Sequence, residues 1–329
     1  MRIIDVHAHI LTPECISIAG PLPAPDKDPF TFFTTPETAE VNRRMFAQIQ
    51  SKLLTPEERI EDMKRMGVDM QAISPSPTQY FYWTDAPTGA LLARMQNDRI
   101  KEVVDRYPTR FVGLGTLPMQ AVDLALEELA RVMKLGFAGV EISTNVNGID
   151  LDHPQFSPFF AKAEELEALI FIHPIGFTHA DRMRECYLNN IIGQPLESTL
   201  AISRLIFGGV LERHPRLSIC IAHGGGYLPF YPGRLDHAWR VRPECRLTPR
   251  PPSTYLSKLY FDSVVYSAES LSNLVRQVGS DRIVIGTDYP FDMGESDPVG
   301  LIERTPNLSS ADRNRMLGEN AARLLKVES

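Results

Sequence analysis

The chain has 329 residues, of which 43% are hydrophobic and 23% charged, so we expect a globular protein with a large buried core. The net charge of -7 argues against nucleic acid or an anionic membrane surface as a partner, because both need a basic face. No apolar run reaches the roughly 18 residues that a membrane span requires. The four cysteines form no Cys-x-x-Cys pair, which argues against a disulfide framework. These features predict a cytosolic protein.

The first ten residues carry the first chemical signal. Residues 3–9 are an apolar run that predicts a strand ending in His7 and His9. Alternate side chains of a strand share a face, so the two imidazoles lie about 7 Å apart along the chain on the same side. Imidazole is the commonest metal ligand, and two from one strand end form half of a metal site. The alternative is a chance pair of histidines at a strand end.

Residues 11–54 follow as an insertion rich in Pro, Thr and Phe, which we expect to be irregular and to cover the functional site. A regular pattern resumes at Thr55, an N-cap residue followed by Pro56, and predicts a helix through Met66 that ends at Gly67. Strands and helices then alternate, with helices such as 121–135 and 158–167. The further predicted strands are residues 68–74, 110–116, 137–143, 169–173, 217–222, 259–263 and 282–287.

Eight strands rich in Val, Ile, Leu and Phe and separated by helices are typical of a parallel sheet buried on both faces. We therefore predict an α/β fold, a (β/α)8 TIM barrel, in which residues 1–329 form a single domain. The alternative is an open doubly wound sheet, but its glycine-rich phosphate fingerprint is missing after the first strand. The proline-rich residues 243–256 predict a second loop excursion, and residues 310–326 predict a final helix.

Polar residues follow the ends of several predicted strands, where the active site of a barrel lies. His173 ends the fifth strand, His223 follows the sixth, and Asp288 follows the eighth. Together with His7 and His9 they form a nitrogen and oxygen donor set that suits Zn²⁺ or a similar divalent ion. A lone His or Asp at a strand end is more often structural, but the combination indicates a metal site.

Three longer segments share a further feature, a likeness to one known family. They are residues 110–120 (Arg-Phe-Val-Gly-Leu-Gly-Thr-Leu-Pro-Met-Gln), 222–226 (Ala-His-Gly-Gly-Gly) and 286–291 (Gly-Thr-Asp-Tyr-Pro-Phe). With these segments the chain resembles, from end to end, the metal-dependent amidohydrolase superfamily. The nearest branch is that of the non-hydrolytic decarboxylases typified by aminocarboxymuconate-semialdehyde decarboxylase. The superfamily has the (β/α)8 barrel fold that the strand pattern predicts.

The resemblance implies a role for each residue at the strand ends. It implies that one Zn²⁺ per chain is bound by His7, His9, His173 and Asp288 together with a water. His223 is then the catalytic acid/base, and Asp288 can also take part in proton transfer. The fourth strand carries Glu141 in place of the bridging lysine of binuclear relatives, which favours one metal. An imidazole suits proton transfer at neutral pH, since its ordinary pKa is about 6.5.

The resemblance also points to residues on the substrate side. Arg234 matches an arginine that in the family reaches the site of the neighbouring subunit and holds a substrate carboxylate, which implies a homodimer. The alternative for Arg234 is a surface charge. Phe291 and Trp83 are candidates for the wall of the substrate cavity.

Several positions depart from the family pattern. Ala47 stands where the family has an arginine in the insertion, and Arg43 or Arg44 is a candidate to replace that charge. Two expected tryptophans fall on Ile175 and Asn190, which makes the pocket smaller and more polar and leaves Asn190 as a substrate-binding candidate. We therefore expect a zinc-chelating hydroxylated aromatic carboxylate as substrate.

The expected function is a metal-dependent non-oxidative decarboxylase, a carboxy-lyase, acting on a small unsaturated or hydroxylated aromatic carboxylate. A metal-dependent hydrolase or hydratase on the same scaffold is the nearer alternative, since metal-activated water can attack other bonds. A barrel that only binds a ligand or partner is the farther alternative.

Overall fold

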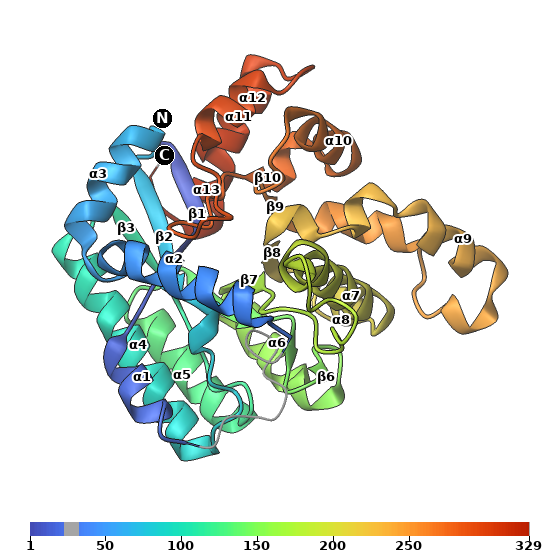
Figure 1. Ribbon diagram of the computed structural model, residues 1–329. Helices are drawn as coiled ribbons and strands as arrows, with labels where there is room; N and C mark the ends of the chain where they lie inside the picture. Colours follow the sequence, from blue (N-terminus) through green and yellow to red (C-terminus); the bar gives the residue numbers. More distant parts are fainter. Residues whose placement is uncertain (23–32, 329) are drawn as a thin grey trace.

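The computed structural model describes residues 1–22 and 33–328. Its main element is a parallel sheet of eight strands in the order β1-β2-β3-β4-β7-β8-β9-β10. The backbone N–H of Val6 donates to the carbonyl of Ile285 at 2.9 Å, which closes the sheet into a barrel and confirms the predicted fold (Figure 1). The strands are β1 (Ile4–Ile10), β2 (Met70–Pro75), β3 (Phe111–Gly115), β4 (Gly139–Ser143), β7 (Leu169–His173), β8 (Ser218–Ile221), β9 (Tyr260–Asp262) and β10 (Ile283–Val284).

Helices surround the barrel, and each predicted helix lies within two residues of an observed one. These outer helices are α3 (Pro56–Met66), α4 (Ala86–Arg106), α5 (Val122–Lys134), α6 (Ser157–Glu165), α7 (Gln194–Phe207), α8 (Val210–Arg213), α10 (Ala268–Val278), α11 (Pro298–Arg304), α12 (Ser310–Asn314) and α13 (Asn320–Leu325). A π-helical turn, Arg315–Glu319, joins α12 to α13, so the predicted final helix is present with this one irregularity. A short hairpin of β5 (Asn145–Val146) and β6 (Ile149–Asp150) follows β4.

The packing of the core shows which side chains of a strand face the outer helices and which face the inside of the barrel. In β7, Ile170 and Ile172 pack with apolar residues of the outer helices, whereas Phe171 belongs to a second cluster of buried residues. The ring of Phe171 lies 5.0 Å from that of His7. Because side chains alternate along a strand, His173 shares the face of Phe171 and points to the inside of the barrel mouth.

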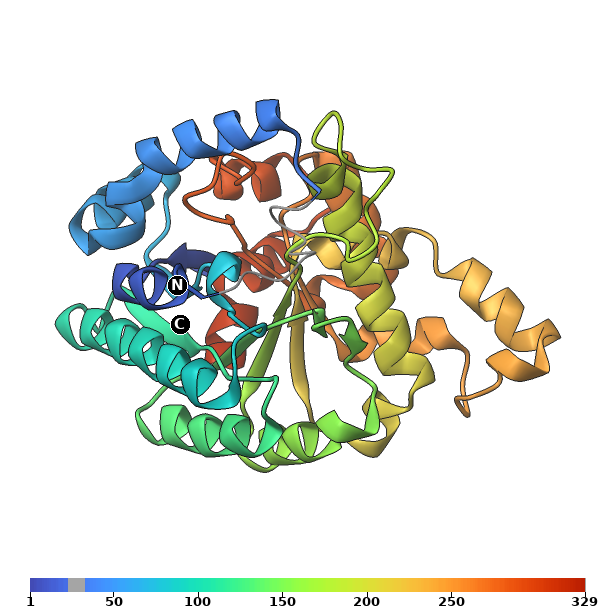
Figure 2. The same ribbon diagram turned by 60° about the horizontal axis from the view of Figure 1, so that its bottom comes forward.

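The insertion is more regular than predicted. Of residues 11–54, 23–32 lie outside the described part, and the rest includes two helices, α1 (Pro13–Ala19) and α2 (Pro36–Leu54). Thr35 caps α2 by accepting from the amide of Thr38, and Met45, Ile49 and Leu53 form a buried stripe at helical spacing. The expectation of an irregular insertion was wrong because this stripe follows a segment whose composition alone is typical of loops. Figure 2 shows α2 lying across one end of the barrel.

A second excursion projects from the side of the barrel (Figures 1 and 2). It consists of α9 (Gly233–Val241) and the 3-10 turns Pro243–Cys245 and Pro252–Lys258, which confirms a loop excursion over 243–256. No residue of α9 is buried, although its sequence is amphipathic. Among the described residues, no helix is long and apolar enough to cross a membrane.

Candidate functional site

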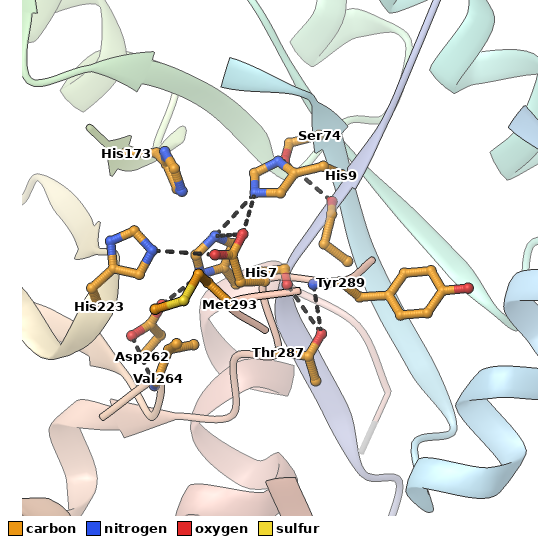
Figure 3. A network of polar contacts seen from close by, with 12 residues as sticks. His7, His9, Ser74, His173, His223, Asp262, Val264, Thr287, Tyr289 and Met293 are labelled. Atoms are coloured by element: carbon orange, nitrogen blue, oxygen red, sulfur yellow. Dashed lines mark hydrogen bonds and ion pairs between the residues drawn. The ribbon is translucent and has the colours of Figure 1, made fainter. Parts of the chain in front are cut away.

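The structure brings the four histidines and the aspartate together at the ends of the strands. The Nε2 atoms of His7 and His9 are 3.0 Å apart (Figure 3). Asp288 Oδ1 lies 3.3 Å from the first and 3.2 Å from the second. One ligand atom from each of His7, His173, His223 and Asp288 lies within 4.8 Å of the others. The ring of His173 is 4.9 Å from the ring of His223 and 5.0 Å from that of His9. All five predicted residues therefore face one small volume.

The outer nitrogens of His7 and His9 already have acceptors. His7 Nδ1 is 2.6 Å from a carboxylate oxygen of Asp262, and His9 Nδ1 is 3.2 Å from the carbonyl of Pro75. A proton on each Nδ1 leaves the Nε2 lone pairs facing each other across 3.0 Å. Two lone pairs at this distance repel unless a proton or a cation lies between them. The arrangement is the one that metal-binding histidines with outer hydrogen-bond acceptors adopt.

The inner face of the site holds polar atoms without partners. Both ring nitrogens of His173 are buried and have no hydrogen-bond partner among the described residues. Oδ1 of Asp288 is also buried, and it faces the Nε2 atoms of His7 and His9 at 3.3 Å and 3.2 Å. Unpaired buried polar atoms are costly, and such groups in a native protein require an explanation. A divalent cation bound by His7, His9, His173 and Asp288 satisfies these atoms, and the mixture of imidazole and carboxylate donors suits zinc and similar metals.

Burial and neighbouring charge shift the pKa values of these groups in the direction that favours a cation. Burial, followed by the charges of His223 and His7, lowers the pKa of His173 well below its ordinary value, so this ring is neutral. Burial raises the pKa of Asp288, but the charge of His7 and hydrogen bonds outweigh it and leave the pKa well below normal. Burial lowers the pKa of His7, but Asp288 and Asp262 reverse this and raise it well above normal. A cation can take the place of the proton on His7.

His223 occupies a different kind of position. Its backbone has a φ of 55°, and Gly224 after it has a φ of 60°, so the chain turns sharply just beyond β8. This left-handed conformation is uncommon for a residue other than glycine. Its Nε2 lies 3.5 Å from Asp288 Oδ2, while its Nδ1 is buried without a partner among the described residues. His223 thus approaches the site from the side opposite β1 and can move a proton.

A buried network holds the segment that carries Asp288. Asp5 accepts hydrogen bonds from the amide of His7 at 3.0 Å and from the hydroxyl of Thr287 at 2.6 Å. Gln71 donates to the same carboxylate at 2.8 Å. Burial raises the pKa of Asp5 to about 6. These bonds fix β1 against the residue that precedes Asp288.

Arg59 of α3 supports the site from outside the barrel. It is 1% exposed, donates to the carbonyl of His9, and donates to Gln71 Oε1 at 3.2 Å. Its guanidinium also covers the ring of Tyr289, whose hydroxyl donates to Asp62 at 2.6 Å. Burial lowers the pKa of Arg59 to about 10, so it keeps its charge at neutral pH. The helix after the insertion therefore braces both β1 and the Asp288 segment.

Sequence reasoning missed two buried residues near the site, Asp262 at the end of β9 and Arg59 on α3. Glu141 of β4, which the sequence analysis considered only as a missing metal bridge, accepts from the hydroxyl of Tyr80 at 2.7 Å. The strand-end rule that found His173 also applies to Asp262, which follows the apolar residues of its strand. Arg59 stands among acidic and basic residues of a helix and looks like an ordinary surface charge.

Two pockets open next to the converging residues. The larger has a volume of about 420 Å³, includes His223 and Asp288 in its lining, and is otherwise mainly apolar. The smaller, about 50 Å³, lies beside His173 and Asp288 and is lined by Ile175, Asn190 and Phe291 among others. Asn190 lines both pockets. A volume of about 420 Å³ falls in the range of small-molecule sites.

Other predicted residues lie farther away. Arg234 is an exposed residue of α9 and lines none of these pockets of its own chain. Ala47 and Trp83 line a separate apolar hollow of about 560 Å³ between α1 and α2, which contains no titratable side chain among its described lining residues. Arg43 and Arg44 both pair with Glu40 on the exposed face of α2. Neither arginine is among the described residues that line these pockets.

Known proteins resemble this chain in sequence and in fold. The sequence model of the amidohydrolase family matches residues 4–327. A 2-amino-3-carboxymuconate-6-semialdehyde decarboxylase of Dictyostelium discoideum is 40% identical over 88% of this chain and 81% of its own length. The 5-carboxyvanillate decarboxylase of Sphingomonas paucimobilis superposes with a TM-score of 0.88 at 26% identity, over 99% of both chains.

A further solved structure is a dihydroxybenzoic acid decarboxylase of a Polaromonas species with bound manganese and the inhibitor 2-nitroresorcinol. It superposes with a TM-score of 0.82 at 26% identity, over 99% of this chain and 97% of its own. The likeness in sequence and in fold extends over nearly the whole barrel, including both segments that carry His7 and Asp288. The chain belongs to the amidohydrolase family.

Proposed function

We propose that this protein is a metal-dependent, non-oxidative decarboxylase of a small aromatic or unsaturated carboxylate. The observation that carries the proposal is the position of His223. It lies in the wall of a pocket of about 420 Å³ and faces Asp288 and the neighbouring imidazoles. A proton donor, a cation-binding donor set and an apolar cavity therefore meet at one point. The named relatives are decarboxylases, which supports the same reaction.

In this reaction the bond between the substrate carbon and its carboxylate breaks and CO₂ leaves. The electron pair remains on that carbon, and a proton must be added to it. His223 supplies this proton from the pocket side and regains a proton from solvent, while Asp288, with Oδ2 3.5 Å from Nε2, orients the ring. A bound divalent metal, held by His7, His9, His173 and Asp288, supplies positive charge that stabilises a substrate oxygen.

The proposed metal is one zinc ion per chain. Three imidazoles and one carboxylate form a donor set that zinc accepts well, although the Polaromonas relative carries manganese. Glu141, the acidic residue of β4, lies behind His9 with its Oε2 3.7 Å from Nδ1 of that ring, on the side away from the other ligand atoms. This position favours a single metal.

The proposed substrate is a hydroxylated aromatic acid that binds the metal through its carboxylate and the adjacent oxygen. The wall contributed by Pro195, Phe230 and Val265 suits a ring, and Asn190 supplies a hydrogen-bonding group. No lysine or arginine is among the described residues that line the pocket. A substrate carboxylate therefore needs the metal and a cation from outside this chain.

We propose a homodimer in which Arg234 of one chain supplies that cation to its partner's pocket. Two features support this arrangement. Helix α9 projects from the barrel without a buried residue, and Tyr231 next to it is 66% exposed. Ile191 and Tyr227, both in the lining of the pocket, are 44% and 39% exposed. An apolar face beside an open pocket is typical of an interface.

Two further parts of the proposal concern the role of the insertion and the cellular location of the protein. Met45 of α2 lines the smaller pocket beside His173, so we propose that the described part of the insertion, residues 11–22 and 33–54, forms part of the cover of the site within one domain. A cytosolic location stays a prediction from the composition.

The decisive test is a substrate panel with detection of CO₂. Purified protein, loaded in turn with zinc and with manganese, is incubated with aminocarboxymuconate semialdehyde and with ortho-hydroxylated benzoates. Release of CO₂ from at least one acid, lost in His223→Ala, is the expected result. Consumption of a substrate with addition of water and without CO₂ would instead assign a hydratase or hydrolase.

A further inference from the structure

Asp262, at the end of β9, contacts two parts of the site at once. It is fully buried, and its Oδ2 lies 2.6 Å from Nδ1 of His7. Its Oδ1 accepts the backbone amide of Gly224 at 2.8 Å and that of Val264 at 3.2 Å. Figure 3 shows the Asp262 side chain between His7 and the segment of Val264. One carboxylate thus joins a proposed metal ligand to the residue after His223.

The contact with His7 fixes which nitrogen of that ring carries hydrogen. An ionised carboxylate only accepts hydrogen bonds, so a 2.6 Å contact places the hydrogen on Nδ1. The Nε2 lone pair then points toward His9 and Asp288, where a metal ligand is needed. The opposite tautomer would put a hydrogen on Nε2 and block coordination. This selection of tautomer by an outer carboxylate is a general feature of metal-binding histidines.

The contact with Gly224 restrains the turn that carries His223. His223 and Gly224 both have positive φ angles, 55° and 60°. A histidine in this conformation is strained and keeps it only where surrounding contacts enforce it. The bond from Gly224 to Asp262 is one of these contacts, together with the amide of Gly226 donating to the carbonyl of His223 at 3.1 Å.

The neighbouring backbone is built to admit this carboxylate. A Cβ on Gly286 would lie 2.7 Å from Cβ of Asp262 and 3.1 Å from its Oδ2. Such distances are too short for a side chain at 286, so glycine two residues before Asp288 leaves the space that Asp262 occupies. The segment that carries the proposed ligand Asp288 therefore leaves room for Asp262, the residue that orients the proposed ligand His7.

We infer that Asp262 is a positioning residue that sets the Nδ1–H tautomer of His7 and holds the His223 turn, so that metal binding and placement of the acid/base depend on one carboxylate. The inference rests on the proposed metal site and not on the reaction. It is therefore tested by metal binding, tautomer state and hydrogen exchange instead of by turnover.

The variant Asp262→Asn separates the two contacts. An asparagine oxygen can still accept from Gly224, but its NH₂ group then faces His7 Nδ1 and favours the tautomer with hydrogen on Nε2. We expect the dissociation constant for zinc, measured by chelator competition, to rise about 10- to 100-fold. Nitrogen-15 chemical shifts of His7 should move to the Nε2–H pattern. Deuterium uptake in the peptide covering residues 222–227 should stay as in the wild type.

Asp262→Ala should weaken zinc binding and also increase deuterium uptake over residues 222–227, because both contacts are lost. The matched control is Glu141→Gln, which changes another fully buried carboxylate next to a proposed ligand. His9 Nδ1 already has the carbonyl of Pro75 at 3.2 Å, so this variant should change zinc affinity less than threefold. Melting temperatures of the metal-free proteins establish that each variant is folded.

Two results would overturn the inference. One is unchanged zinc affinity in a folded Asp262→Asn protein. The other needs no variant: in metal-free wild type, at a pH high enough to make the His7 ring neutral, nitrogen-15 shifts that place its hydrogen on Nε2 exclude the assigned role. Absence of zinc binding by the wild type would refute the proposed metal site. The tautomer measurement would still test whether Asp262 sets the tautomer of His7.

Discussion

The guanidinium carbon of Arg59 lies 4.7 Å from the centre of the Tyr289 ring, so a buried arginine of α3 covers the residue next to Asp288. The same guanidinium donates to the carbonyl of His9 at the end of β1. A cation in this position joins the two chain segments that supply three of the four proposed metal ligands. It acts without contacting the ligand side chains themselves.

Replacing Arg59 by methionine should destabilise the protein by about 3 kcal/mol, because several charge-assisted hydrogen bonds inside the structure are lost. Urea denaturation of the metal-free protein measures this change. Arg43→Met is the matched control, since Arg43 makes an exposed ion pair with Glu40 and should leave stability almost unchanged. Equal effects of the two variants would contradict the bracing role.

Metal content should separate the proposed ligands from the acid/base. We expect about one divalent ion per chain in the wild type and in His223→Ala, and well below one in His173→Ala, whose ring nitrogens have no other described partner. Elemental analysis after gel filtration gives these ratios. Two tightly bound ions in the wild type, or loss of metal in His223→Ala, would refute the assignment.

Substitution of Asn190 should reveal the polar feature of the substrate. Asn190→Leu removes the amide while keeping a similar volume, so the KM for hydroxylated aromatic acids should rise about tenfold, the effect of one lost hydrogen bond. The KM for acids without the hydroxyl group should be the same in Asn190→Leu as in the wild type. Steady-state kinetics on matched pairs of acids provides the comparison, and a uniform change in both classes would argue against direct contact.

Mixed dimers test the proposed role of Arg234. Arg234→Ala and His223→Ala should each be inactive alone, but a mixed dimer contains one site with both residues intact. Random assortment of equal amounts should restore about a quarter of the wild-type activity, because half the dimers are mixed and each has one complete site. Coexpression with two different tags allows this measurement. No recovery in an isolated mixed dimer would place Arg234 outside the partner's site.

The rate at which the Cys15 thiol is alkylated should show whether helix α1 of the insertion is packed against the barrel. Burial raises the pKa of Cys15 in α1 to about 12, and Cys15 is completely buried against Leu92 of α4. The thiolate is the reactive form, so a raised pKa means slow alkylation at pH 8. Iodoacetamide should modify the exposed Cys186 rapidly and leave Cys15 unmodified, as peptide mass spectrometry can determine. Rapid modification of Cys15 in the folded protein would show that α1 is not held in place.

Much of the barrel could be predicted from the sequence because each strand is short, apolar and bounded by turn residues. The strand predicted for residues 169–173 matches β7 at both ends, and its last residue, His173, lies at the site. The parallel topology follows from the helices between the strands. These are local patterns, and local patterns are what a single sequence displays best.

Contacts between distant segments were harder to predict. Asp262 is 255 positions from His7, and nothing near either residue indicates a contact of 2.6 Å. Arg59 is buried because α3 packs against β1 and Tyr289, which only the assembled fold determines. The helix α2 was missed for a different reason: its stripe of Met45, Ile49 and Leu53 is visible in the sequence but was outweighed by the loop-like composition before it.

The pairing of β1 with both β2 and the segment after β10 has a consequence for how the protein is made. Strand β1 leaves the ribosome long before its second neighbour, because Ile285 follows Asp5 by 280 positions in the chain. Until then one edge of β1 is unpaired, and its two histidines lack the carboxylate of Asp288. Binding of the proposed metal therefore requires synthesis through residue 288, and protein interrupted before that residue should have an open, aggregation-prone sheet edge.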